Sequence, residues 1–412
     1  MKKILLLFVA ASIVMVSCKE EATEPLEAEY AKYSVEENKA NIEQEGLAVL
    51  EKMDAMKQMQ APKGIQQLMF LMENDETFGF DPKVANLLRP LANADQQLLG
   101  IAELRSTNES TENLSDLFEA KGGVYTFSAT DSSFDRAPSA TEITFVFPLG
   151  TSTTNNGKLS ISNYTYKVAT NADFQGTELP KTLSITMKDG ATSLLTLEVI
   201  ATYGTNDLPS SEKTTFSVLE GYSFAQEATY KEDKITWDFG FGYQKKDFFK
   251  GGFDMTGTFP YAQLKNELAI DMINQVDAQV QLGNLKAVGK MAYAKMMENM
   301  ESMGNTPVAS QEEVIDIMCT VMNEHIKVVL LYADDVEAIA KLNFYRGEET
   351  DYRYNMETQQ EELVTYPSLG IKFAFKDGSA MDDSFFQTGF NDLKTAWTSF
   401  VNDMMTNYNL AE

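Results

Sequence analysis

Alternating apolar and polar residues between positions 120 and 260 predict an antiparallel sheet. An apolar side chain at every second position gives a strand one buried face and one solvated face. Lys188-Asp189-Gly190 separates two such runs and predicts a hairpin turn. Because turn signals recur roughly every dozen residues, we expect a meander of about eight strands. The clearest runs are Tyr125/Phe127/Ala129, Ile143/Phe145/Phe147, Leu183/Ile185/Met187, Leu195/Leu197/Val199 and Ile235/Trp237/Phe239/Phe241.

Helical patterns lie on both sides of this meander. Residues 29–59 are charged and helix-favouring, and Ala61-Pro62-Lys63-Gly64 is expected to end that helix. Further helices are expected at 65–73 and 82–104. After the meander, an apolar stripe returns every fourth position and predicts another helix. The stripe consists of Leu264, Leu268, Met272, Val276 and Val280.

The carboxy-terminal part predicts one more helix, a hairpin and a final helix. Gly304-Asn305-Thr306-Pro307 precedes a helix that begins near Gln311. The expected hairpin pairs Tyr352/Tyr354/Met356 with Ile371/Phe373/Phe375. The final amphipathic helix carries Phe385, Phe390, Leu393, Trp397 and Phe400.

Together these patterns predict an α+β fold in which a large curved antiparallel meander is covered by flanking helices. The expected organisation is a signal peptide (1–17), an acidic tether (18–28), a helical region (29–115), the meander (116–260), a second helical region (261–341) and a hairpin plus helix (342–412). Residues 29–412 either form one compact unit or divide further.

The amino terminus predicts export and lipidation. Lys2 and Lys3 precede an apolar stretch from position 4 to 16, which is shorter than the roughly 20 residues that span a bilayer. The following Met15-Val16-Ser17-Cys18 resembles a bacterial lipobox, with Met15 where leucine is usual. The resemblance implies cleavage before Cys18 and acylation of that residue, including a diacylglyceryl group on its sulfur and palmitate-type chains. An ordinary secretory signal is the alternative.

The residues after the cysteine indicate where the anchor lies. Lys19, Glu20 and Glu21 resemble the surface-export signal of Bacteroidota lipoproteins, in which a Lys or Ser is followed by acidic residues. The resemblance implies the outer face of the outer membrane, and the periplasmic face is the alternative. The same three residues also suit a plain solvated linker.

The net charge of the chain limits the classes of partner that it can bind. The chain carries 34 basic and 61 acidic residues, a net charge of −27. Loss of residues 1–17 would remove Lys2 and Lys3 and leave 32 basic against 61 acidic residues, or −29. Such a body repels nucleic acid phosphates and anionic lipid head groups, so no nucleic-acid partner is expected. The expected partners are the membrane through its anchor, an outer-membrane protein, and a small ligand as a further option.

Cysteine and histidine offer little catalytic chemistry. After processing, Cys319 is the remaining cysteine, so no intramolecular disulfide can form. The single histidine, His325, lies six residues further on, which is about 240° around a helix. We therefore predict an inert buried thiol, no cofactor and no enzymatic activity.

Two methionine triplets are the metal candidates. Met297, Met300 and Met303 have a spacing of three, as do Met53, Met56 and Met59. Thioether sulfurs suit Cu(I), although flexible methionines filling a core or lining an adaptable groove are the favoured interpretation.

Two other motifs are chance matches. Asp131, Ser133, Asp135 and Glu142 fall on ligand positions of a calcium loop, but Arg136 stands where the turn needs glycine. Gly240-Phe241-Gly242 lies within a strand pattern and lacks the third glycine of a phosphate loop.

Tyr164 and Tyr166 are candidate ligand-stacking residues. They follow Leu159 and Ile161 with a change of phase, which predicts a β-bulge. Their rings suit sugar stacking, although ordinary strand packing is the favoured interpretation.

These observations favour a membrane-anchored lipoprotein that acts as a non-enzymatic interaction or accessory subunit at the outer membrane or cell surface. The alternative is a binder or carrier of a hydrophobic or glycan ligand held between sheet and helices. A hydrolase with two carboxylates is the third hypothesis.

Overall fold

The structure, a computed structural model, describes residues 28–73, 114–170, 176, 178–205, 207, 209–260, 272–304, 310–355, 360–381 and 389–408. The signal peptide, Cys18 and the export residues Lys19, Glu20 and Glu21 lie outside these ranges. The helix predicted over 82–104, as well as Leu264, Leu268, Met356 and Phe385, also lies outside them.

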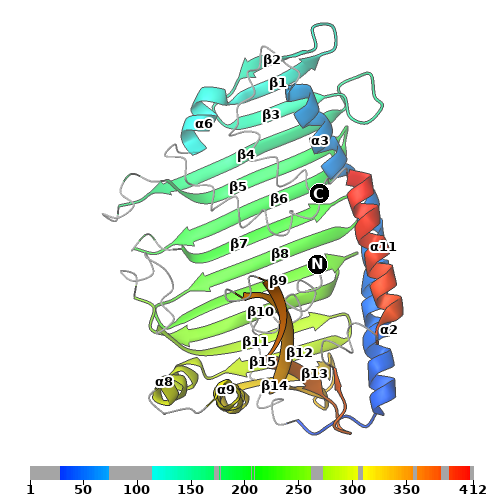
Figure 1. Cartoon of the computed structure of the whole chain (residues 1–412). Coiled ribbons are helices and arrows are strands. Elements are labelled where there is room, and N and C mark those ends of the chain that lie inside the picture. Colours follow the sequence, from blue (N-terminus) through cyan, green and yellow to red (C-terminus); the bar gives the residue numbers. More distant parts are fainter. Residues whose placement is uncertain are drawn as a thin grey trace. The chain divides into compact units, whose positions relative to one another are not determined.

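The fold is α+β, and most of the described chain forms a mixed, mainly antiparallel sheet of sixteen strands (Figure 1). The strand order is β16-β15-β14-β13-β12-β11-β10-β9-β8-β7-β6-β5-β4-β3-β1-β2. Neighbours in sequence are therefore neighbours in the sheet, as expected of a meander. The departure is β1, which pairs antiparallel with β2 and parallel with β3.

The chain divides into two compact units, which are described separately. Unit 1 comprises Met1–Val49, Lys231–Asp238 and Phe249–Thr395. Unit 2 comprises Leu50–Tyr230, Phe239–Phe248 and Ala396–Glu412. Strands β9 (Lys234–Tyr243) and β10 (Lys246–Gly257), and helices α2 (Val35–Met53) and α11 (Asn391–Tyr408), contribute residues to both.

Unit 2 contains the predicted alternating strands. They are β1 (Gly123–Ser128), β2 (Ser133–Pro138), β3 (Glu142–Phe147), β4 (Gly157–Val168), β5 (Glu178–Asp189), β6 (Thr192–Tyr203), β7 (Pro209–Val218) and β8 (Tyr222–Tyr230). The central residues of their apolar faces are buried, as Phe145, Ile185 and Leu197 illustrate with 0% exposure, whereas Phe127 and Val199 are half-buried. The predicted turn is confirmed, because Asp189 pairs with Thr192 and Gly190 has a φ of +54°. Across positions 120–260 the structure has ten strands rather than about eight.

Helix α3 (Gln60–Glu73) packs on this apolar face. A Cβ on Gly64 would lie 2.1 Å from Cε of Met187, so the helix approaches the sheet as closely as a glycine permits. The prediction that Ala61-Pro62-Lys63-Gly64 ends a helix was wrong, since these residues form the first turns of α3. Pro62 is tolerated there because the first N–H groups of a helix have no intrahelical partner. The break comes earlier, where the 3-10 helix η2 (Asp54–Gln58) follows α2.

Unit 1 contains β11 (Ile273–Leu282), β12 (Leu285–Met291), α8 (Tyr293–Gly304), α9 (Gln311–His325), β13 (Ile326–Tyr332), β14 (Ala338–Asn355), β15 (Gln360–Ala374) and β16 (Ala380–Met381). Its core joins α2 to these strands. The Tyr332 hydroxyl donates to Asn38 Oδ1 at 2.8 Å and accepts from Asn41 Nδ2 at 2.9 Å. Val35, Val328, Ile339 and Phe375 belong to one buried cluster.

The helical region predicted for 261–341 was wrong over 273–291, where the chain forms the hairpin β11–β12, and also over 326–332 and 338–341, which belong to β13 and β14. Val276 and Val280 lie four residues apart, and on a strand this spacing also places them on one face, with Ala278 between them. Gly283 has a φ of +56° and lies in the tight turn between the strands.

The carboxy-terminal hairpin is confirmed as β14–β15, but its predicted register was wrong. Tyr352 pairs with Leu363, and Phe373 pairs with Leu342. Both strands are longer than the sequence pattern indicated, which moves the apolar residues away from one another along the ladder. Helix α11 follows as predicted. Within the described ranges, no helix is both long enough and apolar enough to cross a membrane.

Candidate functional site

Unit 2 contains a cleft of about 600 Å³ between helix α6 (Leu114–Lys121), the β2–β3 connection and strand β4. Its walls combine aromatic rings with hydroxyl, amide and guanidinium groups. They include Phe118, Arg136, Ser139, Thr141, Tyr164 and Tyr166. Both tyrosines singled out in the sequence therefore line this cleft.

A β-bulge in β4 brings these tyrosines to the cleft. Ser162 pairs with Ser184 and Thr165 with Thr182, so two residues of β4 face one residue of β5. Asn163, one of the two, has a φ of +56°. The extra residue changes the phase of the strand, and even-numbered Tyr164 and Tyr166 follow odd-numbered Leu159 and Ile161 on the same face. The bulge predicted from the sequence is confirmed.

Three aromatic rings form a continuous stack. Phe118 and Tyr164 lie nearly parallel, with centroids 5.6 Å apart and an interplanar angle of 3°. Tyr166 continues the stack, with its centroid 5.6 Å from that of Tyr164 and an angle of 25°. Tyr166 remains 42% exposed, so this end of the stack is accessible from the solvent, whereas Phe118 at the other end is buried.

The buried carboxylate of Glu178 at the start of β5 fixes the stack. It accepts the backbone N–H of Ser115 at 3.0 Å and also the Ser115 hydroxyl. Ser115 lies in the first turn of α6, where a negative charge is favourable. The same carboxylate accepts the Tyr164 hydroxyl at 2.9 Å. One side chain therefore anchors both the helix that carries Phe118 and the strand that carries Tyr164.

The environment keeps Tyr164 a hydrogen-bond donor. Burial, and secondarily its hydrogen bond to Glu178, raise the pKa of the Tyr164 hydroxyl well above its ordinary value. The phenol therefore stays protonated at all physiological pH values, and its proton is committed to Glu178.

Arg136 supplies the positive charge of the cleft. Its Nε and Nη2 donate to the Gly122 carbonyl oxygen at 3.2 and 2.8 Å. Its guanidinium carbon lies 5.9 Å from the centroid of the Tyr125 ring. Ser139 and Thr141 add hydroxyl groups to the same wall, with their oxygens 3.4 Å apart.

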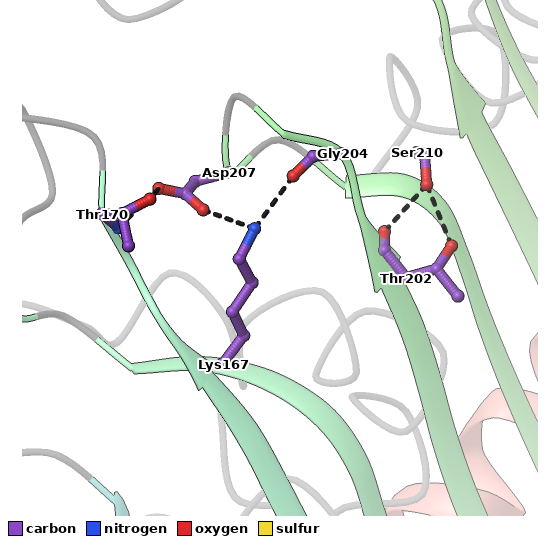
Figure 2. Close-up of polar contacts among 6 residues, drawn as sticks. All are labelled: Lys167, Thr170, Thr202, Gly204, Asp207 and Ser210. Atoms are coloured by element: carbon purple, nitrogen blue, oxygen red, sulfur yellow. Dashed lines mark hydrogen bonds and ion pairs between the residues drawn. The ribbon is translucent and has the colours of Figure 1, made fainter.

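An ion pair between the half-buried Lys167 and the buried Asp207 holds the end of β4 (Figure 2). Lys167 Nζ lies 2.6 Å from Asp207 Oδ1 and donates to the Gly204 carbonyl at 2.9 Å. The other oxygen of Asp207 accepts the Thr170 N–H at 2.7 Å and its hydroxyl at 3.2 Å. Both carboxylate oxygens are thus used inside the protein, so we assign this cluster a positioning role.

The methionine candidates are spread over α8, α2 and η2, and Met53 is the last residue of α2. Met297, Met300 and Met303 are half-buried on α8 in unit 1. Met56 lies in η2 and Met59 directly after it, and both are buried. In the described ranges, no group of three or more His, Cys, Asp or Glu residues is placed to hold a metal ion.

Cys319 and His325 both lie on α9. Burial is the main cause of a raised pKa for the Cys319 thiol. The His325 ring nitrogen Nε2 instead lies 2.7 Å from Asn299 Nδ2. The geometry therefore supports a packing role for the thiol.

The calcium-loop match does not form a loop around an ion. Ser133 and Asp135 lie on β2, Glu142 lies on β3, and β1 separates the two strands in the sheet. Asp131 accepts the Ser128 hydroxyl and Glu142 that of Thr144, both nearby in sequence. Gly240 and Gly242 lie within β9, as the alternation predicted.

Phe118 and Glu178 are the site residues that sequence reasoning missed. Glu178 is one of 61 acidic residues, and its surrounding pattern does not set it apart. Phe118 belongs to a short helix whose contact with β4 is a long-range feature. The chain matches no protein-family model, no curated protein and no solved structure.

Proposed function

We propose that the protein is a lipid-anchored lipoprotein, held at the outer face of the outer membrane through Cys18, that binds a neutral glycan in the cleft of unit 2. The observation that carries the proposal is the exposed ring of Tyr166 at the end of the stack that it forms with Tyr164 and the buried Phe118. The C–H groups on a sugar face are weakly positive and suit the negative face of an aromatic ring.

The remaining cleft walls favour a sugar over a lipid. Binding sites fix their ligands through a few placed polar groups, and this cleft offers Arg136, Ser139, Thr141 and Asn163 beside its rings. A volume of about 600 Å³ accommodates a short oligosaccharide. The net charge of −27 makes a neutral glycan a better ligand than an acidic one.

The cleft chemistry suits binding rather than hydrolysis. A glycosidase needs two carboxyl groups at the scissile bond, one of them free to give a proton. Among the described residues that line the cleft, Glu119 is the one carboxylic acid, and the nearby Glu178 uses its oxygens to accept Ser115 and Tyr164, so a pair of free carboxyl groups is missing there. We accordingly retain the prediction that the protein is not an enzyme.

Binding of neutral oligosaccharides tests the proposal. Cellotriose, maltotriose, chitotriose and xylotriose would be titrated into the protein by isothermal calorimetry. We expect at least one to bind and the Tyr166→Ala variant to weaken that binding about two- to twelvefold, since one ring contact contributes roughly 0.5–1.5 kcal/mol.

Tyr352→Ala is the matched control, because Tyr352 is 67% exposed and lies in unit 1. It should bind like the wild type. Absence of binding for all four sugars, or equal binding by the Tyr166→Ala variant, would contradict the glycan proposal.

The anchor is tested separately. Radiolabelled palmitate should enter the wild-type protein and not the Cys18→Ser variant, and protease added to intact cells should digest the surface-exposed form. Replacement of Lys19, Glu20 and Glu21 by alanine should protect the protein from that protease by leaving it on the periplasmic face. Unchanged digestion would contradict the export signal.

A further inference from the structure

The hairpin β14–β15 in unit 1 extends beyond the strands that flank it. Its fifteen pairs run from Lys341↔Ala374 to Asn355↔Gln360. On one side, β13 pairs with β14 only up to Lys341, and on the other, β16 pairs only with Phe373 and Ala374. In the described ranges, no further strand pairs with either outer edge of the ribbon.

Helix α9 holds the base of this ribbon. The Asn323 side chain donates to the Phe344 carbonyl and accepts the Phe344 N–H, both at 2.8 Å, and so substitutes for a neighbouring strand. Arg346 forms an ion pair with Asp316 of α9. These contacts end at position 346, and the outer part of the ribbon continues beyond them.

We call residues 348–355 and 360–367 the distal arm. Tyr352 and Leu363 are directly paired across its two strands, and they are 67% and 61% exposed. An isolated two-stranded ribbon is marginally stable in water, and its free edges are templates for another strand. At one free edge, the Tyr352 N–H donates to the carboxylate of its neighbour Asp351 at 2.9 Å, a contact that an incoming carbonyl would replace.

The net negative charge of the distal arm favours a positively charged partner. It contains Glu348, Glu349, Asp351, Glu361 and Glu362 against a single Arg353, a formal net charge of −4. Two copies of this chain would bring equal negative charges together, and anionic lipid head groups would be repelled. A basic polypeptide segment instead neutralises these carboxylates and covers Tyr352 and Leu363.

We propose that the distal arm is a docking element that adds an extended basic segment of a partner protein as a third strand. Backbone hydrogen bonds supply the affinity, and the acidic side chains together with the Tyr352–Leu363 pair supply the selectivity. The arm lies in unit 1 and the glycan cleft in unit 2, so this inference does not depend on the glycan proposal.

Synthetic peptides test the docking element. A fluorescent octapeptide of alternating lysine and valine would be titrated into the full lipidated protein in neutral detergent, with binding followed by anisotropy. Two matched probes accompany it: the same peptide with alternate amides N-methylated, and its glutamate–valine counterpart. We expect the lysine–valine peptide to bind, and both matched probes to bind at least tenfold more weakly.

Variants locate the contact. Tyr352→Thr/Leu363→Thr keeps strand-favouring residues and should weaken binding about tenfold, as should Glu348→Lys/Glu361→Lys. The control Glu298→Lys/Glu324→Lys makes the same charge change on exposed positions of α8 and α9 and should leave binding unchanged. Far-UV circular dichroism verifies that each variant retains its strands.

Several outcomes would overturn the inference. If the N-methylated peptide bound as tightly as the unmethylated lysine–valine peptide, the interaction would be charge attraction alone, without strand addition. An equal loss in the control variant would show that the arm is not the site. Binding to phosphatidylcholine vesicles, or self-association, that disappears in Tyr352→Thr/Leu363→Thr would replace the partner strand by a membrane or a second copy.

Discussion

Two hairpins of this protein have the same local pattern but different surroundings. In the hairpin β5–β6, Ile185 pairs with Leu197, and both side chains are 0% exposed because β4 and β7 flank the pair and the apolar face is covered. In the distal arm, Tyr352 pairs with Leu363, and both side chains are mostly exposed. Cross-strand apolar pairing therefore identifies a hairpin, while flanking strands and a covering layer decide whether its apolar face is core or surface.

The largest expected difference between the two hairpins comes from truncating one leucine in each. Leu197→Ala should lower the free energy of unfolding by about 2–5 kcal/mol, because it removes buried methyl groups and leaves a cavity. Leu363→Ala should change it by less than about 0.5 kcal/mol, since the side chain is already hydrated. Native hydrogen exchange of the β5–β6 and distal-arm amides measures both. Equal effects would break the comparison.

A second difference lies in the polar contacts at the strand ends. Asp207→Ala in unit 2 removes the acceptor of Lys167 and of the Thr170 N–H, and should destabilise by about 1–3 kcal/mol. Lys167 is 31% exposed, so its freed ammonium group can turn toward water, which limits the loss.

The control for that experiment is the exposed pair Lys213–Glu227, whose charged atoms lie 3.7 Å apart. Glu227→Ala should cost no more than about 1 kcal/mol. Thermal unfolding of both variants against the wild type supplies the comparison. A larger loss of stability in Glu227→Ala than in Asp207→Ala would show that burial of Asp207 does not strengthen its contacts.

The base of the β14–β15 ribbon should respond more weakly. The Tyr345 ring lies across from Gly370, and a Cβ there would meet the ring at 2.7 Å, so the aromatic side chain covers a bare stretch of backbone. Tyr345→Ala should weaken the ribbon by about 0.5–1 kcal/mol and speed hydrogen exchange there while β5–β6 exchange is unaffected. Faster exchange throughout unit 1 would mean that the ribbon unfolds together with its base.

The smallest effect near neutral pH is expected from the ionisation of buried tyrosines. Burial raises the pKa of Tyr164 and of Tyr222, both in unit 2, above the ordinary tyrosine value of 10. A raised pKa means that the folded state prefers the protonated phenol. The stability from this preference is complete below pH 10 and declines as pH rises above 10.

Urea unfolding between pH 8 and 11.5, followed by circular dichroism, measures that decline. Tyr164→Phe should flatten the dependence because it removes one of the buried tyrosines whose pKa is raised. An unchanged slope in this variant would exclude Tyr164 as a source of the alkaline instability.

The sequence predicted the elements better than their partners. Period-two alternation located β3, β5 and β6, and the change of phase located the bulge at Tyr164. The four-residue spacing gave a wrong helix prediction over 273–291. Such a spacing keeps residues on one face of a helix, and it also keeps them on one face of a strand, whose side chains alternate. The register of β14–β15 was missed because cross-strand alignment depends on total strand length and flanking contacts.

The sequence by itself determined the strand-rich α+β class, the bulge that turns Tyr164 and Tyr166, and the absence of a disulfide framework, since these follow from local periodicity and composition. Only the tertiary structure decided that Glu178 anchors Ser115 and Tyr164, and that one hairpin is buried while another projects an acidic arm. These features depend on contacts between residues that are far apart in the sequence, for example 14 positions for Tyr164 and Glu178 and 63 positions for Ser115 and Glu178. Local periodicity carries no information about such contacts.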